Sequence, residues 1–497
     1  MSAAALVSPD ESLVDFLAQD RSKDLLRFTT AGSVDDGKST LIGRLLYDSR
    51  SVYEDQLESV TKASAGRNAG AIDFSLLTDG LRAEREQGIT IDVAYRYFAT
   101  PRRKFIIADT PGHEQYTRNM VTGASTAELA IILVDARKGL LPQSRRHAYL
   151  ASLLGLRHLV IAVNKMDLVG YQASVFRSIE AEFREFLARF HAIESFFVPI
   201  SALAGDNVVT RSARMPWFSG PSLLEFLETV PVGDSARKAA FRFPVQRVVR
   251  PNQHFRGYAG SVVSGSVRPG DAVTILPSGR QTRIASITTF DGDLEQASAG
   301  QAVTLTVADD IDIGRGDMLV PQGDLPQVAN TVRATLVWLN DQPSNQRTRY
   351  RLKHTTRQQW ASIRRIEHRV NVNTLAREAV EGLAMNEIAV VEIESARELV
   401  FDPYSENRAT GSFILIDEGT NATVAAGLIS EAVEGSDSQL QALPSEINWQ
   451  VENGKLILHL GEAAESIDFG NVAPQTSTDS EALNALALLL RRLRREA

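Results

Sequence analysis

Two short segments of this 497-residue chain carry side chains that could bind a nucleotide. The first matches the pattern G-x-x-x-x-G-K-[ST], which predicts a loop whose backbone N–H groups surround phosphate oxygens. We expect Lys38 to neutralise the β- and γ-phosphates and the Ser39 hydroxyl to bind Mg²⁺. A helix that begins here would add its dipole to phosphate binding. The segment consists of Gly32, Ser33, Val34, Asp35, Asp36, Gly37, Lys38, Ser39 and Thr40.

The second segment consists of Asn164, Lys165, Met166 and Asp167, directly after the apolar residues 159–163. A carboxylate at Asp167 could accept hydrogen bonds from guanine N1–H and the 2-amino group, which adenine cannot offer. By itself this pattern is more often a surface turn. Downstream of a phosphate loop in the same domain, it predicts that the nucleotide is GTP. The backbone of Ser201, Ala202 and Leu203 would support the base.

A third segment reads Asp109, Thr110, Pro111, Gly112 and His113, after the apolar residues 104–108. We expect Asp109 to reach Mg²⁺ through water and Gly112 N–H to meet the γ-phosphate. A tight turn at the end of a strand is the alternative. A lone histidine is more often structural than catalytic. The position of His113 directly after this segment nevertheless predicts that it orients the attacking water.

Residues 84–91, Glu-Arg-Glu-Gln-Gly-Ile-Thr-Ile, precede a predicted strand. Without the other motifs they would indicate a helix-to-strand turn. In a GTPase, Thr90 would close over Mg²⁺ and the γ-phosphate and move away after hydrolysis. The candidate catalytic residues are therefore His113, Thr90 and Lys38, and the candidate metal ligands are Ser39, Thr90 and Asp109.

Alternating strands and helices are predicted to position these residues. Near-continuous apolar runs indicate strands that are buried on both faces, as in a parallel sheet. We expect them at residues 25–31, 104–108, 129–134, 159–163 and 196–200, with helices at 38–47 and 175–190. The fold class predicted for residues 1–238 is an α/β P-loop GTPase domain with a doubly wound, mostly parallel sheet.

The remainder of the chain has a different pattern of apolar residues. Short alternating runs interrupted by glycine and proline predict two small β-barrels, at residues 239–325 and 326–430. Residues 431–497 are predicted to form a short α+β C-terminal extension, with a hairpin at 448–451 and 455–460 and a helix after Thr478. This extension is either a packing appendage, the commoner case, or a partner-binding helix.

Composition excludes several other kinds of chemistry. The chain has no cysteine, which rules out disulfides, thiolate catalysis and cysteine-bound zinc. It contains no H-E-x-x-H pattern and no apolar run of ~18 residues, so we expect neither that metal site nor a membrane partner. Its N-terminus lacks the features of a secretory signal, and we expect a cytoplasmic protein. The net charge of −8 lowers the expectation of a nucleic-acid partner.

These motifs and the two following β-domains resemble the translational GTPases, the elongation-factor class, over about residues 25–430. Within that class, residues 32–48, 78–98, 245–252 and 421–427 look like the GTPase subunits of bacterial sulfate adenylyltransferases. Asp36 stands where elongation factor Tu typically has histidine.

The resemblance implies GTP and Mg²⁺ as cofactors and a catalytic adenylyltransferase subunit as partner, in a heterodimer or a higher assembly. That partner joins ATP and sulfate to give adenosine 5′-phosphosulfate and pyrophosphate, an uphill reaction that GTP hydrolysis would drive. The sequence contains no H-x-G-H motif and no second phosphate loop, which fits such a division of labour. A translation-factor-like GTPase that binds RNA or the ribosome is the alternative.

Overall fold

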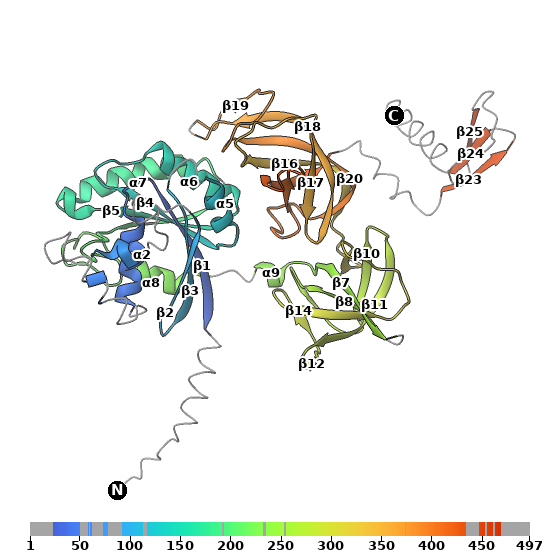
Figure 1. Cartoon of the computed structure of the whole chain (residues 1–497), viewed down its shortest axis with the longest axis horizontal. Helices are drawn as coiled ribbons and strands as arrows, with labels where there is room; N and C mark the ends of the chain where they lie inside the picture. Colours follow the sequence, from blue (N-terminus) through green and yellow to red (C-terminus); the bar gives the residue numbers. More distant parts are fainter. Residues whose placement is uncertain are drawn as a thin grey trace, which may run out of the picture.

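The computed structural model describes most of the three predicted domains and part of the extension (Figure 1). The described residues are 23–49, 58, 60–61, 73–77, 92–112, 117–190, 193–231, 235–252, 255–372 and 374–433, with the backbone of 447–452, 455–460 and 463–468. No helix among them is long and apolar enough to cross a membrane.

The first domain is built on a 6-stranded sheet in the order β2-β3-β1-β4-β5-β6. Strands β3, β1, β4, β5 and β6 run parallel, and β2 pairs antiparallel with β3. Every residue of β4 is buried, as expected for a strand covered on both faces. The predicted mostly parallel sheet is thus confirmed. The strands are β1 (Asp24–Gly32), β2 (Ala94–Ala99), β3 (Arg103–Asp109), β4 (Leu129–Asp135), β5 (His158–Asn164) and β6 (Glu194–Pro199).

Helices cover both faces of this sheet (Figure 1). On one face, α2 (Lys38–Asp48) and α8 (Leu223–Thr229) pack against side chains such as Phe28 and Ile107. On the other face, α5 (Thr117–Ser125), α6 (Pro142–Leu153) and α7 (Ala173–Leu187) pack against side chains such as Ile132 and Ile161. Short helices η1 (Phe74–Leu77), η3 (Met166–Val169) and α9 (Ser235–Lys238) complete the described helices.

The second domain is a β-barrel. Its strands follow the order β10-β15-β7-β8-β14-β11, and a further β10–β11 pairing joins the two ends of that run. Closure removes the unpaired edges that an open sheet would leave. The strands are β7 (Phe243–Asn252), β8 (Phe255–Ser261), β9 (Ser266–Val267), β10 (Ala272–Leu276), β11 (Arg280–Thr289), β12 (Gly292–Asp293), β13 (Ala297–Ser298), β14 (Ala302–Val307) and β15 (Met318–Pro321).

The third domain is a second β-barrel, in the order β17-β21-β22-β16-β20-β18, closed by a β17–β18 pairing. Its core contains Trp338 and Phe401, both almost fully buried. The predicted barrel architecture is confirmed in both domains. The strands are β16 (Gln327–Trp338), β17 (Arg349–His354), β18 (Arg357–Val370), β19 (Arg377–Glu378), β20 (Ile388–Phe401), β21 (Ser412–Ile416) and β22 (Thr423–Ala432).

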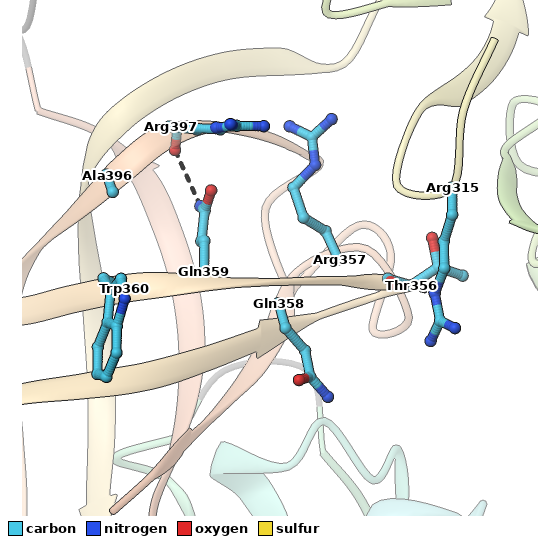
Figure 2. Close-up of a pocket in the computed structure, with 8 residues that line it drawn as sticks. All are labelled: Arg315, Thr356, Arg357, Gln358, Gln359, Trp360, Ala396 and Arg397. Atoms are coloured by element: carbon cyan, nitrogen blue, oxygen red, sulfur yellow. Dashed lines mark hydrogen bonds between the residues drawn. The ribbon is translucent and has the colours of Figure 1, made fainter. Parts of the chain in front are cut away.

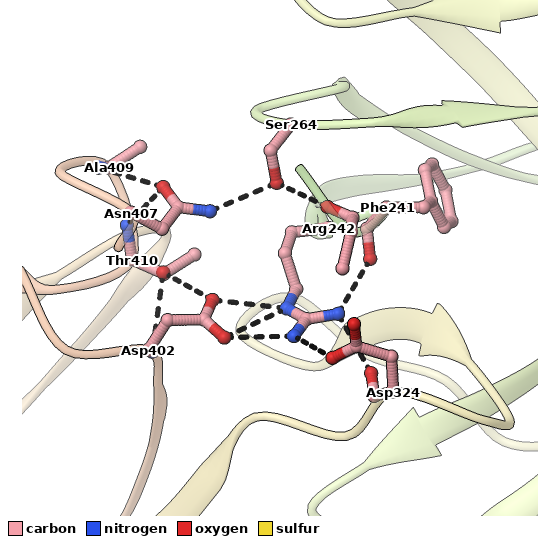
Figure 3. Close-up of polar contacts among 9 residues, drawn as sticks. Phe241, Arg242, Ser264, Asp324, Asp402, Asn407, Ala409 and Thr410 are labelled. Atoms are coloured by element: carbon pink, nitrogen blue, oxygen red, sulfur yellow. Dashed lines mark hydrogen bonds and ion pairs between the residues drawn. The ribbon is translucent and has the colours of Figure 1, made fainter. Parts of the chain in front are cut away.

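A buried arginine joins the two barrels (Figure 3). The Arg242 guanidinium donates to the Asp402 carboxylate at 2.8 and 3.0 Å and to Asp324 Oδ1 at 3.0 Å. Thr410 Oγ1 also donates to Asp402, at 2.7 Å. Because Arg242 is only 2% exposed, its charge depends on these carboxylates for compensation.

The third domain also contacts the first. Tyr404 Oη donates to the Leu154 carbonyl at 3.0 Å, and Arg408 Nη1 donates to the Ala127 carbonyl at 3.0 Å. Arg408 also donates to the Gly155 carbonyl. These bonds connect the barrel to the ends of α5 and α6, the helices that flank β4.

The described part of the extension is a 3-stranded sheet, β23 (Ile447–Glu452), β24 (Lys455–Leu460) and β25 (Ala463–Asp468). β23 and β24 pair antiparallel, which confirms the predicted hairpin. The third strand, β25, was not predicted, because Ala463, Ala464, Glu465 and Ser466 have weak strand propensity. The predicted helix after Thr478 lies outside the described residues.

Candidate functional site

The phosphate-loop motif connects β1 to α2, the arrangement that its pattern requires. Gly37 caps α2 with φ +94°, a left-handed conformation that favours glycine. No side chain forms a capping hydrogen bond with the first backbone N–H groups of this helix. The loop therefore presents backbone donors and the positive end of a helix to any anion bound there.

Asp36 closes the loop on itself. Its Oδ2 accepts a hydrogen bond from Ser33 N at 2.7 Å, and its own N–H donates to the Ser33 carbonyl at 3.2 Å. Burial raises the pKa of Asp36 to about 6, even though the bond from Ser33 and the charge of Lys38 oppose this shift. Its other carboxylate oxygen is buried without a hydrogen-bond partner among the described residues. The loop thus contains a carboxylate that the protein environment disfavours in its charged form.

Asn164 connects the two nucleotide motifs. Its Nδ2 donates to the Asp36 carbonyl at 2.8 Å, and its Oδ1 accepts from Ala202 N at 2.9 Å. A Cβ at Gly37 would lie 2.5 Å from Asn164 Nδ2, so a larger residue there would force the two motifs apart. One buried amide therefore fixes the phosphate loop and both base-side segments in one arrangement.

Lys165 strengthens the same connection. It donates to the Asp35 carbonyl and forms an ion pair with Asp135 at 3.1 Å. Both Asp35 and Lys165 have positive φ, 68° and 63°, which is uncommon for residues other than glycine. Such strain is tolerated where surrounding contacts impose it, and it clusters at ligand sites.

The base-side residues divide into exposed and buried positions. Asp167 Oδ1 accepts a hydrogen bond from Ser201 Oγ at 2.7 Å, which orients its carboxylate. Leu203, in the chain segment after β6, is 58% exposed. Met166, in contrast, is fully buried in the core. Met166 therefore anchors residues 164–167 in the core, and its backbone N–H donates to the Ile200 carbonyl at 3.2 Å.

The third motif lies against the phosphate loop. A Cβ at Gly112 would lie 2.4 Å from both the Gly32 carbonyl and Lys38 Nζ. Lys38 is buried, and burial lowers its pKa, while Asp109, Asp36 and Asp35 oppose that shift electrostatically. Thr110 Oγ1 donates to the Thr30 carbonyl at 2.7 Å, which holds this turn on β1. Pro111 follows within the same turn and is buried.

The oxygen ligands near Lys38 fit a magnesium ion. Ser39 lies in the first turn of α2, and Asp109 ends β3 with Oδ1 3.3 Å from Thr30 Oγ1. Mg²⁺ is usually held by one or two carboxylates together with nucleotide phosphates. Nowhere in the described residues do three or more His, Cys, Asp or Glu side chains form a group that could hold a metal ion by themselves. Ser39 and Asp109 would thus hold the ion together with the phosphates.

Of the three predicted catalytic residues, only Lys38 lies among the described residues. His113 and Thr90 lie outside the described residues, as does the whole of 78–91. The roles of His113 and Thr90 therefore remain predictions. Two further residues of the first motif are described: Val34 is 36% exposed, and Thr40 is half-buried in α2.

Sequence reasoning missed Asp135, at the end of β4. Burial would raise the pKa of Asp135, but hydrogen bonds from Arg137 and the charge of Lys165 outweigh burial and lower it. The carboxylate is therefore charged and holds Lys165 in place. The available signal was its position, because ligand sites form at the carboxyl ends of parallel strands.

A separate cavity of about 690 Å³ lies where the two barrels meet (Figure 2). Within it Gln359 Nε2 donates to the Arg397 carbonyl at 2.9 Å. None of its residues belongs to the nucleotide motifs, so it is distinct from the site above. It is lined by Arg315, Thr356, Arg357, Gln358, Gln359, Trp360, Ala396 and Arg397.

Family models match three successive parts of the chain. Residues 23–232 match the elongation factor Tu GTP binding domain, and residues 258–320 match elongation factor Tu domain 2. Residues 331–430 match the GTP-eEF1A C-terminal domain-like family. The matched segments correspond to the α/β domain and the two barrels.

Individual proteins are similar over most of the chain. One named sulfate adenylyltransferase subunit 1, from Alteromonas mediterranea, is 50% identical over 90% of this chain and 95% of that protein. Another of that name, from Bacteroides fragilis, is 55% identical over 86% of this chain and 90% of that protein. Bifunctional enzyme NodQ from Rhizobium sp. strain N33 is 51% identical over 90% of this chain and 68% of that protein. A solved structure of sup35 complexed with GDP is 22% identical, covers 83% of this chain and 95% of that one, and has a TM-score of 0.38.

Proposed function

This chain belongs to the sulfate adenylyltransferase subunit 1 family, and we propose that its GTP hydrolysis drives sulfate activation on a separate catalytic subunit. That subunit would join ATP and sulfate to give adenosine 5′-phosphosulfate and pyrophosphate. The reaction is uphill, so it needs a coupled source of free energy. The chain itself is a GTP-hydrolysing enzyme subunit.

The role in sulfate activation is supported by the relatives, and the observation that carries the use of GTP is the connection that Asn164 makes between two motifs. Its amide donates to the phosphate loop at Asp36 and accepts from Ala202 beside the base-side residues. A guanine held by Asp167 would therefore lie at a fixed distance from the phosphates held at Lys38. This arrangement favours GTP, while the partner would use ATP.

We propose the following roles around the phosphates. Lys38 neutralises the β- and γ-phosphate charge, and the N–H of Gly112 donates to the γ-phosphate. Bound Mg²⁺, held by Ser39 and through water by Asp109, would neutralise charge that develops on the phosphates. His113 would orient the attacking water, and Thr90 would close over the site when GTP is bound.

Both partner and coupling belong to the proposal. The names of the relatives include the words subunit 1, which supports a second, catalytic subunit. The chain contains one G-x-x-x-x-G-K-[ST] loop and no H-x-G-H motif, which supports adenylyl transfer on that other chain. We expect a heterodimer or a higher assembly and no nucleic acid in it.

Co-expression of this chain with a candidate catalytic subunit tests the proposal. We expect the pair to hydrolyse GTP faster when ATP and sulfate are both present than when sulfate is omitted. Lys38→Ala, which removes the main countercharge to the phosphates, is the control and should abolish the stimulation. Stimulation by ribosomes, with none by ATP and sulfate, would instead support a translation-type factor.

A further inference from the structure

A buried histidine lies close to the proposed hydrolytic site without belonging to any motif. His147, on α6, is 2% exposed. Burial, with smaller contributions from the charges of Lys38 and Arg146, lowers the pKa of His147 to about 3. The imidazole is therefore neutral at physiological pH, with one nitrogen protonated and the other free to accept a hydrogen bond.

Gln143 connects this imidazole to the third motif. Gln143 Nε2 is 3.3 Å from the Gly112 carbonyl and 3.0 Å from His147 Nε2. A carbonyl oxygen can only accept, so the amide NH₂ group must face it. The two amide hydrogens can then go to Gly112 and to His147. This requires His147 Nε2 to accept and places the ring proton on Nδ1.

That tautomer has a cost. Nδ1 is buried and has no hydrogen-bond partner among the described residues. An unpaired buried N–H loses its bonds to water without replacement. An aliphatic side chain would fill this core position without such a loss. The polar side chain at this position is thus explained by its bond to Gln143 and not by packing.

The Gly112 carbonyl belongs to the peptide that joins Gly112 to His113. A Cβ at Gly112 would lie 2.4 Å from Lys38 Nζ, so this peptide begins beside the phosphate-binding ammonium. A donor fixed on its carbonyl sets the plane of that peptide. The bond from Gln143 therefore holds Gly112 in its place beside Lys38.

We infer that Gln143, held in place by His147, is a positioning residue for GTP hydrolysis that holds Gly112 beside Lys38. This inference rests on the proposed roles of Gly112 and Lys38 in GTP hydrolysis. Gln143 and His147 lie four residues apart on α6, so they share one face of the helix. Helix α6 thereby supports the turn that contains Gly112, in addition to the hydrogen bond from Thr110 to β1.

Three variants separate the effect of the two Gln143 hydrogen bonds from the effect of side-chain shape. Gln143→Met keeps the approximate length and volume of the neutral side chain but cannot donate a hydrogen bond to the Gly112 carbonyl. His147→Leu removes the acceptor that holds Gln143, and His147→Gln keeps an acceptor near the position of Nε2. Gln281→Met, at an exposed position in β11, is the control. GTP affinity, single-turnover hydrolysis and the thermal unfolding midpoint are measured for each.

We expect the rate of GTP hydrolysis by Gln143→Met to fall about 10- to 100-fold, because small misplacements of reacting groups reduce rates by such factors. GTP affinity should be nearly unchanged. His147→Leu should also be slow but should not lower the unfolding midpoint, since the unpaired N–H is removed. His147→Gln should recover most of the rate.

The opposite pattern overturns the inference. A purely structural role predicts normal hydrolysis in Gln143→Met and a lower unfolding midpoint in His147→Leu. Failure of the proposed function is a separate result, because it would appear in the wild-type chain as GTP hydrolysis that ATP, sulfate and the catalytic subunit do not stimulate.

Discussion

At the residue scale, Asp167 is the side chain proposed to select the base. Ser201 Oγ orients its carboxylate at 2.7 Å, so Asp167→Asn should keep the position of the group and change only its chemistry. The second acceptor for guanine is lost, and we expect preference to move toward xanthine nucleotides. A nucleotide competition assay measures this. The same exchange at exposed Asp291 is the control, and retained guanine preference in Asp167→Asn would contradict the assignment.

Asp36 gives the phosphate loop a pH dependence. Burial raises its folded-state pKa to about 6 from an ordinary value of 3.8. The folded protein therefore holds this proton more tightly than the unfolded chain. The resulting stabilisation is complete below about pH 4 and is lost as pH rises through 6. Above that pH, the buried charge lowers the free energy of unfolding by at most about 3 kcal/mol.

Asp36→Asn tests this effect in the nucleotide-free protein. An asparagine oxygen can still accept from Ser33 N, but the charge is absent. We expect the variant to unfold at a higher temperature than the wild type at pH 7.5 and at nearly the same temperature at pH 4.5. Thermal unfolding at both pH values measures the difference, and a gap that does not change with pH would refute the assignment.

At the scale of elements, Gly37 determines how closely the start of α2 approaches the end of β5. Gly37→Ala would place a methyl group 2.5 Å from Asn164 Nδ2 at φ +94°. We expect it to separate the phosphate loop from the base-side segment and to weaken GTP binding more than about tenfold, as loss of ~1.4 kcal/mol would.

Gly139→Ala is the matched control for this prediction. Gly139 also has positive φ, 68°, but a Cβ there meets nothing within 4 Å. It should carry only the backbone strain of a left-handed alanine, about 1–2 kcal/mol, and leave GTP affinity unchanged. Calorimetric titration with GTP distinguishes the two, and equal losses in both variants would mean that strain alone is responsible.

At the scale of the whole molecule, Arg242 joins the two barrels (Figure 3). Arg242→Ala would leave the mostly buried carboxylate of Asp402 without its cation, at a cost of about 3–5 kcal/mol. We expect a lower thermal unfolding midpoint and faster proteolysis between the barrels.

Arg256→Ala provides the comparison. Arg256 pairs with Asp310 and Asp312, whose side chains are 92% and 96% exposed, and such pairs contribute about 0–1 kcal/mol. Its unfolding midpoint should stay close to that of the wild type. If Arg242→Ala behaves in the same way, the two barrels are held together by other contacts.

The parts of this fold that sequence predicted are those with strong local patterns. The fully buried β4 has an uninterrupted apolar run, and the predicted bounds 129–134 differ from the structure by one residue. The edge strand β2 was predicted only as a strand after residues 84–91, without bounds, because exposed side chains alternate in it with partly or fully buried ones. Barrel strands such as β18 carry many arginines on their outer face, which hid their extent.

The sequence by itself was enough to predict the candidate nucleotide-binding residues, because the phosphate loop and the base-side segment are each short and continuous. Their chemistry follows from residue type and spacing. Only the tertiary structure decided that Asn164 joins the two motifs and that Gln143 reaches Gly112. Those contacts connect residues 128 and 31 positions apart, and only the packing of α2 and α6 against a common sheet brings such distant segments together.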